Sequence, residues 1–536
     1  MPDMFDTRWL EPLRLTLQGI ADRMQHCLIS GAHSTVAREG GDCAAALFLP
    51  DGRLLAQARS LPLLLGSLIP AVAAVIEHFP VDTMRQGDGF LLNDPWHGGS
   101  HLPDLVVVRP IVVDGRVVAL AAANLHHQDV GGMTPGSLPP DAREIFHEGM
   151  RIPPVQAWRD DTADAAVRTI LRANSRTPDL LDGDLGAQWA AACLGDREIG
   201  RLVGRHGRNA FLEGSARLFA EAERMMRLTL QCLPDGQAQW DDALDGDGIG
   251  QDPVRLHVTV RKHGDELDID FTGSQAQTAG PVNASPAAML SAALFFMRTL
   301  VPDAPNNAGC LAPLRFVLPP GSVVNPDFPA ALNARTATVK LAVNAVLGAW
   351  SRYLASVAGQ RGDAPMASAA ANAGVATVIS VGGRRENGRR YFFTEIIASG
   401  TGGNSMDSGV AGISSDVSNA RNTPVEILEA RAPVRVRDYA VNAGSGGAGL
   451  HRGGDGVVRS WTLLDGTATV SYRGERHLHR AQGLDGGRPG ACSAAWVVRR
   501  DGTRQDLPAR ARVDLVAGDT LTVRTAGGGG WGSPSA

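Results

Sequence analysis

Two periods of apolar residues run along the first third of the chain, and each predicts one kind of element. Apolar side chains recur at helical spacing over 12–30, which predicts an amphipathic helix. A second helix is expected over about 66–78. The runs 44–49 and 53–58 flank the turn pair Asp51-Gly52, a pattern that predicts a hairpin. The buried face of the first helix would be Leu13, Leu17, Ile20, Met24, Cys27 and Leu28.

A second hairpin is predicted more strongly. The β-prone runs 105–113 and 116–123 are separated by Asp114-Gly115, a two-residue turn signal. An unbroken register from that turn would place His126 opposite Pro103 and beside Asp104, within reach of the acid across the hairpin. The open end of this hairpin is therefore where chemistry is expected.

His101, Asp104 and His126 are the candidate metal ligands. Two imidazoles and a carboxylate with an open fourth position suit catalytic zinc, and the same ligands suit manganese or iron. His127 must point away from His126 on an extended backbone. The alternative interpretation is that these residues are hydrogen-bonded structural histidines and turn formers.

Asp129 is the predicted proton-transferring carboxylate, and Asp94 is the second candidate for that role. Asp94 precedes Pro95, so it equally suits a turn-forming role that orients a histidine. The turn-rich segment 131–140 follows Asp129 directly and could form one wall of a pocket.

The rest of the chain is expected to contain helices through 161–232, a hairpin over 255–271 and a buried helix over 285–300, followed by Gly-rich turns and short strands. The predicted fold class is α+β. Residues 1–235 would form a mixed helix and hairpin region that binds the metal and carries the catalysis. Residues 236–536 would form a mixed α/β to β-rich region that completes the site and the partner interface.

Two Gly-rich segments, 444–449 and 527–532, match the G-x-G-x-x-G pattern of dinucleotide-binding loops. Neither opens a predicted helix, so tight turns or close backbone packing are favoured over dinucleotide binding. The sequence has no G-x-x-x-x-G-K-[ST] phosphate loop and no G-x-S-x-G nucleophile elbow.

Composition narrows the function classes. The chain has 536 residues, 44% of them hydrophobic and 20% charged, enough for more than one packed core. A net charge of −5 without charged blocks argues against binding nucleic acid or anionic membrane.

The longest uncharged stretch, 61–76, is too short and broken to span a bilayer. Six scattered cysteines suit a reducing compartment, and the N-terminus lacks signal-peptide features, so a cytoplasmic location is expected.

An ordered series of motifs resembles the hydantoinase B/oxoprolinase family over essentially the full length. The motifs are Gly87-Asp88-Gly89-Phe90, Asn93-Asp94-Pro95, 98–104, His126, 129–132, 135–137, 144–146, Glu148-Gly149, 151–154, Asn174, 176–178, 183–185, 187–188, 271–274, 280–283, 307–310, 422–426 and the terminal Gly-rich run.

The resemblance implies the second subunit of an ATP-dependent cyclic amide hydrolase, acting on a hydantoin, 5-oxoproline or a lactam. A hydantoinase A-type partner subunit would bind ATP and activate the substrate, in a hetero-oligomer. The metal ligands of the family fall on His101, Asp104 and His126. The alternatives are a subunit of an ATP-dependent ketone carboxylase, of the acetone or acetophenone type, and a non-catalytic structural subunit.

The chain departs from the family pattern at two places. Segment 61–66 reads Leu-Pro-Leu-Leu-Leu-Gly where the family often carries a histidine, and His147 stands where Gln is usual. Leu61 and Leu64 are expected to make that wall of the site more apolar.

Overall fold

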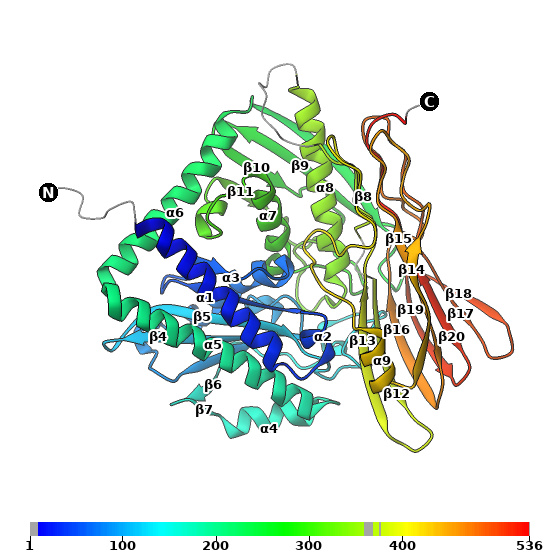
Figure 1. Ribbon diagram of the computed structural model, residues 1–536, viewed down its shortest axis with the longest axis horizontal. Coiled ribbons are helices and arrows are strands. Elements are labelled where there is room, and N and C mark those ends of the chain that lie inside the picture. The colour runs from blue at the N-terminus through cyan, green and yellow to red at the C-terminus, as the bar shows by residue number, and fades with distance from the viewer. Residues whose placement is uncertain (1–8, 359–367, 375–376, 535–536) are drawn as a thin grey trace.

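The computed structural model describes residues 9–358, 368–374 and 377–534, in which helices and four sheets pack around several cores (Figure 1). The predicted α+β class is confirmed, because helices and mostly antiparallel sheets make up the fold. None of the helices in these ranges is long and apolar enough to cross a membrane.

The first sheet is antiparallel throughout and has the strand order β2-β1-β5-β4-β3-β6-β7. Helices α1 (Leu10–Gly31) and α5 (Pro178–His206) cover one face, and α3 (Pro62–His78) covers the other. The helix over 12–30 and both hairpins are therefore present as predicted. The strands are β1 Cys43–Phe48, β2 Leu54–Gln57, β3 Gly89–Leu92, β4 Asp104–Val113, β5 Arg116–His126, β6 Val155–Arg159 and β7 Thr162–Ala163.

The predicted register of the β4–β5 hairpin is wrong by one residue at its open end. Pairing starts as expected at Val113 and Arg116, but a β-bulge between Ile111 and Val112 shifts every later pair. Asp104 consequently lies directly opposite His126, the position at which the unbroken register would have placed Pro103. A bulge adds one residue to one strand, which a turn-based register cannot anticipate.

A second layer lies beyond α3. Helix α7 (Pro286–Leu300) crosses α3 closely, because a Cβ on Gly66 would approach Ser291 Cα to 2.5 Å. Helix α8 (Arg335–Ser356) packs on α7 and on the sheet β11-β10-β9-β8. No sequence pattern had predicted α8, which buries polar residues along with apolar ones. These strands are β8 Gly236–Leu244, β9 Val254–His263, β10 Glu266–Asp270 and β11 Leu314–Val317.

The remaining helices follow the prediction for 161–232 and connect the layers. They are α4 Ala165–Asn174 and α6 Arg208–Gln231, and the short elements elsewhere are α2 Thr35–Arg38, α9 Val425–Arg431 and the 3₁₀ turns η2 Val81–Thr83, η3 Pro95–His97, η4 Ile145–His147 and η5 Ala308–Leu311. The boundary expected near 235 falls between α6 and β8.

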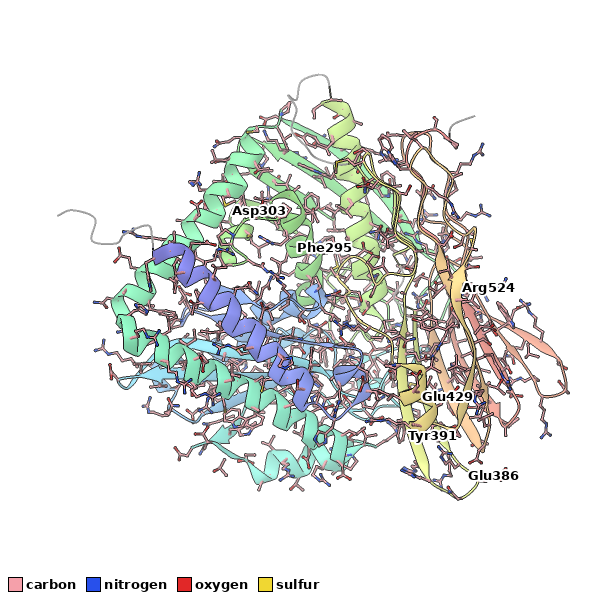
Figure 2. All side chains as sticks on the ribbon, in the orientation of Figure 1. Phe295, Asp303, Glu386, Tyr391, Glu429 and Arg524 are labelled. Carbon is pink, nitrogen blue, oxygen red and sulfur yellow. The ribbon has the colours of Figure 1, made fainter. Side chains whose placement is uncertain are left out.

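The last third folds into a β-sandwich (right in Figure 1), with sheet β13-β12-β16-β19 packed on sheet β14-β15-β20-β17-β18 around Trp461. Figure 2 shows Glu386 at the tip of the β12–β13 connection and Arg524 on β20 in the other sheet. The strands are β12 Thr377–Arg384, β13 Arg390–Ile397, β14 Val434–Asn442, β15 Gly456–Leu463, β16 Thr467–Arg473, β17 Ala494–Val498, β18 Arg504–Leu507, β19 Arg510–Val516 and β20 Thr520–Arg524.

The Gly-rich segments pack backbone against backbone beside this sandwich. Gly528 accepts a hydrogen bond from the N–H of Gly447 and donates one to Gly454. A Cβ on Gly528 would lie 2.0 Å from the carbonyl oxygen of Thr401, so no side chain fits there. Close packing therefore explains these glycines, as the sequence favoured.

Candidate metal centre

His101, Asp104 and His126 converge at the open end of the β4–β5 hairpin. His101 Nδ1 lies 2.9 Å from Asp104 Oδ2, and His126 Nδ1 lies 3.1 Å from Asp104 Oδ1. The two imidazole centroids are 5.0 Å apart. Among the described residues these three form a buried group whose candidate ligand atoms all lie within 4.8 Å of one another.

The pleat of the first sheet decides which way these side chains point. Asn124, two residues before His126 on β5, reaches Ser67 of α3, so the trio lies on the α3 face. His127 points to the other face, where its Nε2 lies 2.9 Å from Gln188 Oε1 of α5. One of the two adjacent histidines faces the site, as the strand period predicts.

The trio has the chemistry that a divalent cation requires. Neither ring nitrogen of the buried His101 has a hydrogen-bond partner of acceptable geometry, which is costly unless another ligand engages it. Ligand atoms about 2.1 Å from a tetrahedral ion lie about 3.4 Å from one another, and the candidate ligand atoms all lie within 4.8 Å of one another, so small side-chain movements would bring them to that spacing. The residues fit a cation site.

The surroundings keep the His101 imidazole neutral and the Asp104 carboxylate ionised, the forms in which each can bind a metal. Burial, with Arg335 nearby, holds the pKa of His101 well below its ordinary value, so the imidazole is neutral at pH 7. Burial alone would raise the pKa of Asp104, but the charge of Arg335 and the hydrogen bond from His126 outweigh it and keep this pKa well below normal. A neutral imidazole beside an ionised carboxylate is what a divalent cation binds.

Arg335, the first residue of α8, fixes the orientation of the carboxylate. Its Nη2 donates to Asp104 Oδ2 at 2.7 Å, and its Nε donates to Ser100 Oγ at 2.8 Å. A hydrogen-bond donor of this kind fixes the orientation of a carboxylate that binds a metal. Sequence reasoning missed Arg335, because 231 residues separate it from Asp104.

His101 and His126 line an inner cavity of about 40 Å³ at the junction of the first sheet, α8 and the sandwich. Its wall combines seven apolar side chains with eight polar or charged ones, which makes it more polar than the mostly apolar wall of a typical small-molecule pocket. Leu138 supplies part of the wall, so the turn-rich segment 131–140 does border a pocket. The lining residues include Val36, Asp42, Leu61, Leu63, His101, His126, Arg335, Thr336, Val378, Thr394, Ile396 and Arg473.

Asp42 is a second functional candidate that sequence reasoning missed. It lies half-buried in the cavity wall, and its carbonyl accepts a hydrogen bond from the N–H of His126. Burial raises its pKa, Asp104 adds to that effect, and His126 and Arg335 oppose it. A carboxyl just before a strand is common, so only its tertiary position singles it out.

An outer cavity of about 350 Å³ adjoins the inner one and shares Leu61, Ile396 and Ala420 with it. The outer wall carries the exposed arginines Arg38, Arg59 and Arg421 together with Glu39.

The structure does not bring Asp129 to the trio. Its carboxylate accepts hydrogen bonds from the backbone N–H groups of Gly131, Gly136 and Arg176 and from Arg176 Nη1. It is fully buried and does not line the inner cavity. A carboxylate saturated with donors favours a loop-organising role over proton transfer.

Asp94 also lies apart from the trio. Its side chain caps η3 by accepting from Trp96 N, and Oδ2 lies 2.8 Å from His97 Nδ1 and 2.6 Å from Arg151 Nε. The turn-forming role that the Asp-Pro pair suggested is the one this geometry supports. The histidine that it orients is His97, outside the trio.

The two departures from the family pattern fall at different places. Leu61 and Leu63 line the inner cavity, whereas Leu64 packs into the core between α3 and the sheet. His147 is 38% exposed and lies beside Glu144, away from the cavity. The apolar wall is therefore formed by Leu61 and Leu63.

Glu148 supports the loop that precedes α8, and it makes stability depend on pH. Its Oε1 accepts from Leu332 N, Asn333 N and Asn333 Nδ2. Burial raises its pKa to about 8, against the opposing effect of those hydrogen bonds. The folded protein thus keeps this proton at pH 7, whereas the unfolded chain, with a carboxyl pKa near 4.5, releases it.

We expect the contribution of Glu148 to stability to fall as pH rises from about 5 to 8, by roughly 1.4 kcal/mol per pH unit at most. In Glu148→Gln this decline should be absent, because the amide does not ionise. Urea unfolding of both proteins at pH 5, 6, 7 and 8 measures the difference. Parallel stability curves would show that the carboxyl does not carry this proton.

The chain is similar in sequence to known proteins over almost its full length. The family described as Hydantoinase B/oxoprolinase matches residues 6–534. The chain is 31% identical to 5-oxoprolinase of Dictyostelium discoideum over 98% of its own length and 41% of that protein. It is 29% identical to a putative D-/L-hydantoinase subunit of Pseudomonas sp. strain NS671, over 99% of this chain and 91% of that one. The chain thus spans about two fifths of the 5-oxoprolinase.

Two solved structures share the fold. The ATP-dependent caprolactamase from Pseudomonas jessenii superposes with a TM-score of 0.90 at 27% identity, covering 99% of this chain and 92% of that one. A nucleotide-free acetone carboxylase superposes with a TM-score of 0.89 at 18% identity, over 99% and 76% of the two chains, which shows the fold alone. The resemblance seen in the sequence motifs is confirmed. The chain belongs to the hydantoinase B/oxoprolinase family.

Proposed function

We propose that this chain is the metal-dependent subunit of an ATP-dependent cyclic amide hydrolase that opens a hydantoin, 5-oxoproline or lactam ring. The observation that carries the proposal is the buried trio His101, Asp104 and His126, whose two histidines line the inner cavity, in a chain of this family. Zinc is our first choice of cation, with manganese and iron as the other metals that suit these ligands.

ATP binding is assigned to a partner subunit of the hydantoinase A type. One relative is named as a subunit of a hydantoinase, and the sequence has no G-x-x-x-x-G-K-[ST] motif. An amide carbonyl is a weak electrophile, so activation with ATP gives the ring opening a chemical reason to need two subunits. The working form is then a hetero-oligomer.

We assign cation binding, substrate contact and proton transfer to different residues of this chain. A cation held by the trio would polarise a substrate oxygen or lower the pKa of water. Leu61 and Leu63 present an apolar wall to the substrate and limit the access of water. Asp42 is the acid we assign to proton transfer, because it lines the inner cavity and burial raises its pKa.

Replacing Asp42 with Asn is expected to lower kcat by about 10²- to 10⁴-fold in the reconstituted complex, the usual contribution of a general base. The rate of the native complex should fall as pH drops through the raised pKa of Asp42, and the variant should lose that acidic limb. Asp129→Asn is the comparison. If it alone abolished the acidic limb while Asp42→Asn kept it, the proton would belong to Asp129.

The reaction class is tested by a substrate screen with the chain, its ATP-binding partner, ATP and the cation. We expect ATP-dependent release of ring-opened amino acid from at least one of hydantoin, 5-oxoproline and caprolactam. Incorporation of labelled bicarbonate into acetone or acetophenone, with no ring opening, would overturn the hydrolase assignment in favour of a ketone carboxylase. Both outcomes are measured on the same preparation.

A further inference from the structure

Arg473 is a buried cation without a carboxylate partner, at the wall of the inner cavity. It ends β16 with 9% of its surface exposed. Its Nη1 donates to the backbone and side-chain oxygens of Asn333 at 2.6 and 3.0 Å. Its Nε is buried with no hydrogen-bond partner, and within the described ranges no acid forms an ion pair with it.

The neighbouring buried arginines are paired, which makes Arg473 distinct. Arg335 pairs with Asp104, and Arg510 pairs with Glu475. The acid that acts on Arg473 electrostatically is Glu148, whose pKa of about 8 leaves it neutral at pH 7. Arg473 itself, with a pKa lowered to about 9 by burial and by Arg335 and Arg510, stays charged.

A buried charge without a counter-charge is strongly unfavourable, and proteins tolerate it where a ligand supplies the missing partner. Arg473 and Arg335 line the same cavity, and their like charges repel each other. A guanidinium fork matches the oxygens of phosphate or carboxylate, so an anion between the two would relieve that repulsion. The outer cavity, with three exposed arginines against one glutamate, would attract the same anions.

We propose that Arg473, beside Arg335, forms an oxyanion subsite in the inner cavity for a phosphoryl or carboxylate group of the substrate. The subsite deepens the proposed function and rests on it only for the identity of the ligand as substrate. It would hold one end of the substrate while the trio acts on the other.

The test measures anion binding by the metal-free full chain, so that neither the cation nor the partner subunit contributes. Inorganic phosphate and acetate are titrated separately by calorimetry. Phosphate binding alone points to a phosphoryl group, acetate binding alone to a carboxylate, and either result supports the subsite. Absence of binding of both anions at roughly 10 mM would overturn it.

Substitutions of Arg473 test whether the anion binds at this residue. Arg473→Gln is expected to weaken the anion Kd at least tenfold, and Arg473→Lys at least threefold, because an ammonium cannot make the paired contact. Arg315→Gln, at a side chain 74% exposed on β11, is the control and should bind as the native chain does. Native affinity in Arg473→Gln would overturn the proposal. If Arg473→Gln does not fold, as judged by its melting curve, the Arg473→Lys result decides.

The outcome is separable from that of the proposed function. Anion binding can be present in a chain that turns over no cyclic amide, and ring opening can occur with no contribution from Arg473. The first result would leave the subsite standing without the hydrolase, and the second would remove the subsite alone.

Discussion

Replacing His101 with Ala is expected to abolish metal binding and, with it, turnover. The native chain should carry about one divalent cation, and the variant less than about a tenth of that, because two remaining ligands do not hold a catalytic ion. Activity of the reconstituted complex should fall by a factor on the order of 10³ or more, since the polarising charge is lost. Metal analysis and kcat on the same preparations measure both effects.

The control for this prediction is His97→Ala, a nearby histidine that contacts Asp94 and lies outside the trio. It should keep both metal and activity. Full activity of His101→Ala with no bound metal would reject the catalytic proposal. Loss of metal and fold with an unchanged rate per folded chain would leave a structural role for the ion, which is the non-catalytic alternative.

The second large effect is expected in the sandwich, at the ion pair between Glu395 and Arg459. Both side chains are fully buried, Arg459 Nε donates to Glu395 Oε1 at 2.8 Å, and the pair joins β13 in one sheet to β15 in the other. Glu395→Ala leaves a buried guanidinium without its partner, so the free energy of unfolding should fall by about 3–5 kcal/mol. Urea unfolding monitored by tryptophan fluorescence measures it.

Two comparisons make this result interpretable. Replacing both Glu395 and Arg459 with Met should restore most of the stability, because an apolar pair of similar volume carries no desolvation cost. Arg504→Ala breaks an exposed pair with Asp506 and should change stability by no more than about 1 kcal/mol. A loss below about 1 kcal/mol in Glu395→Ala would mean that water or another group stabilises Arg459.

Local pattern was sufficient for the elements that carry the candidate metal ligands. The Asp114-Gly115 turn defines the β4–β5 hairpin, and the strand period separates His126 from His127. The actual pairing of Asp104 with His126 depends on the bulge near Ile111, which the turn signal does not encode. The candidate ligands were thus found by local rules, and their close approach was improved by a feature those rules do not contain.

The acids near the candidate ligands show what sequence neighbourhood does not determine. Asp129 and Asp94 follow and precede the hairpin closely in sequence, yet both are engaged by their own loops. Asp42 immediately precedes β1 and reaches the cavity because β1 pairs with β5. Closeness to the hairpin in the sequence therefore did not indicate which acid lines the cavity.

The α+β class, the helices and hairpins of the first sheet, the three candidate ligands and the family could all be inferred before any coordinates. These depend on hydrophobic period, turn residues and motif spacing, which are all local properties. The meeting of Arg335, Asp42 and Arg473 at one cavity follows only from the folded arrangement. They come from α8, the loop before β1 and the end of β16. Contacts across hundreds of residues arise from packing of whole layers, and no short stretch of sequence contains that information.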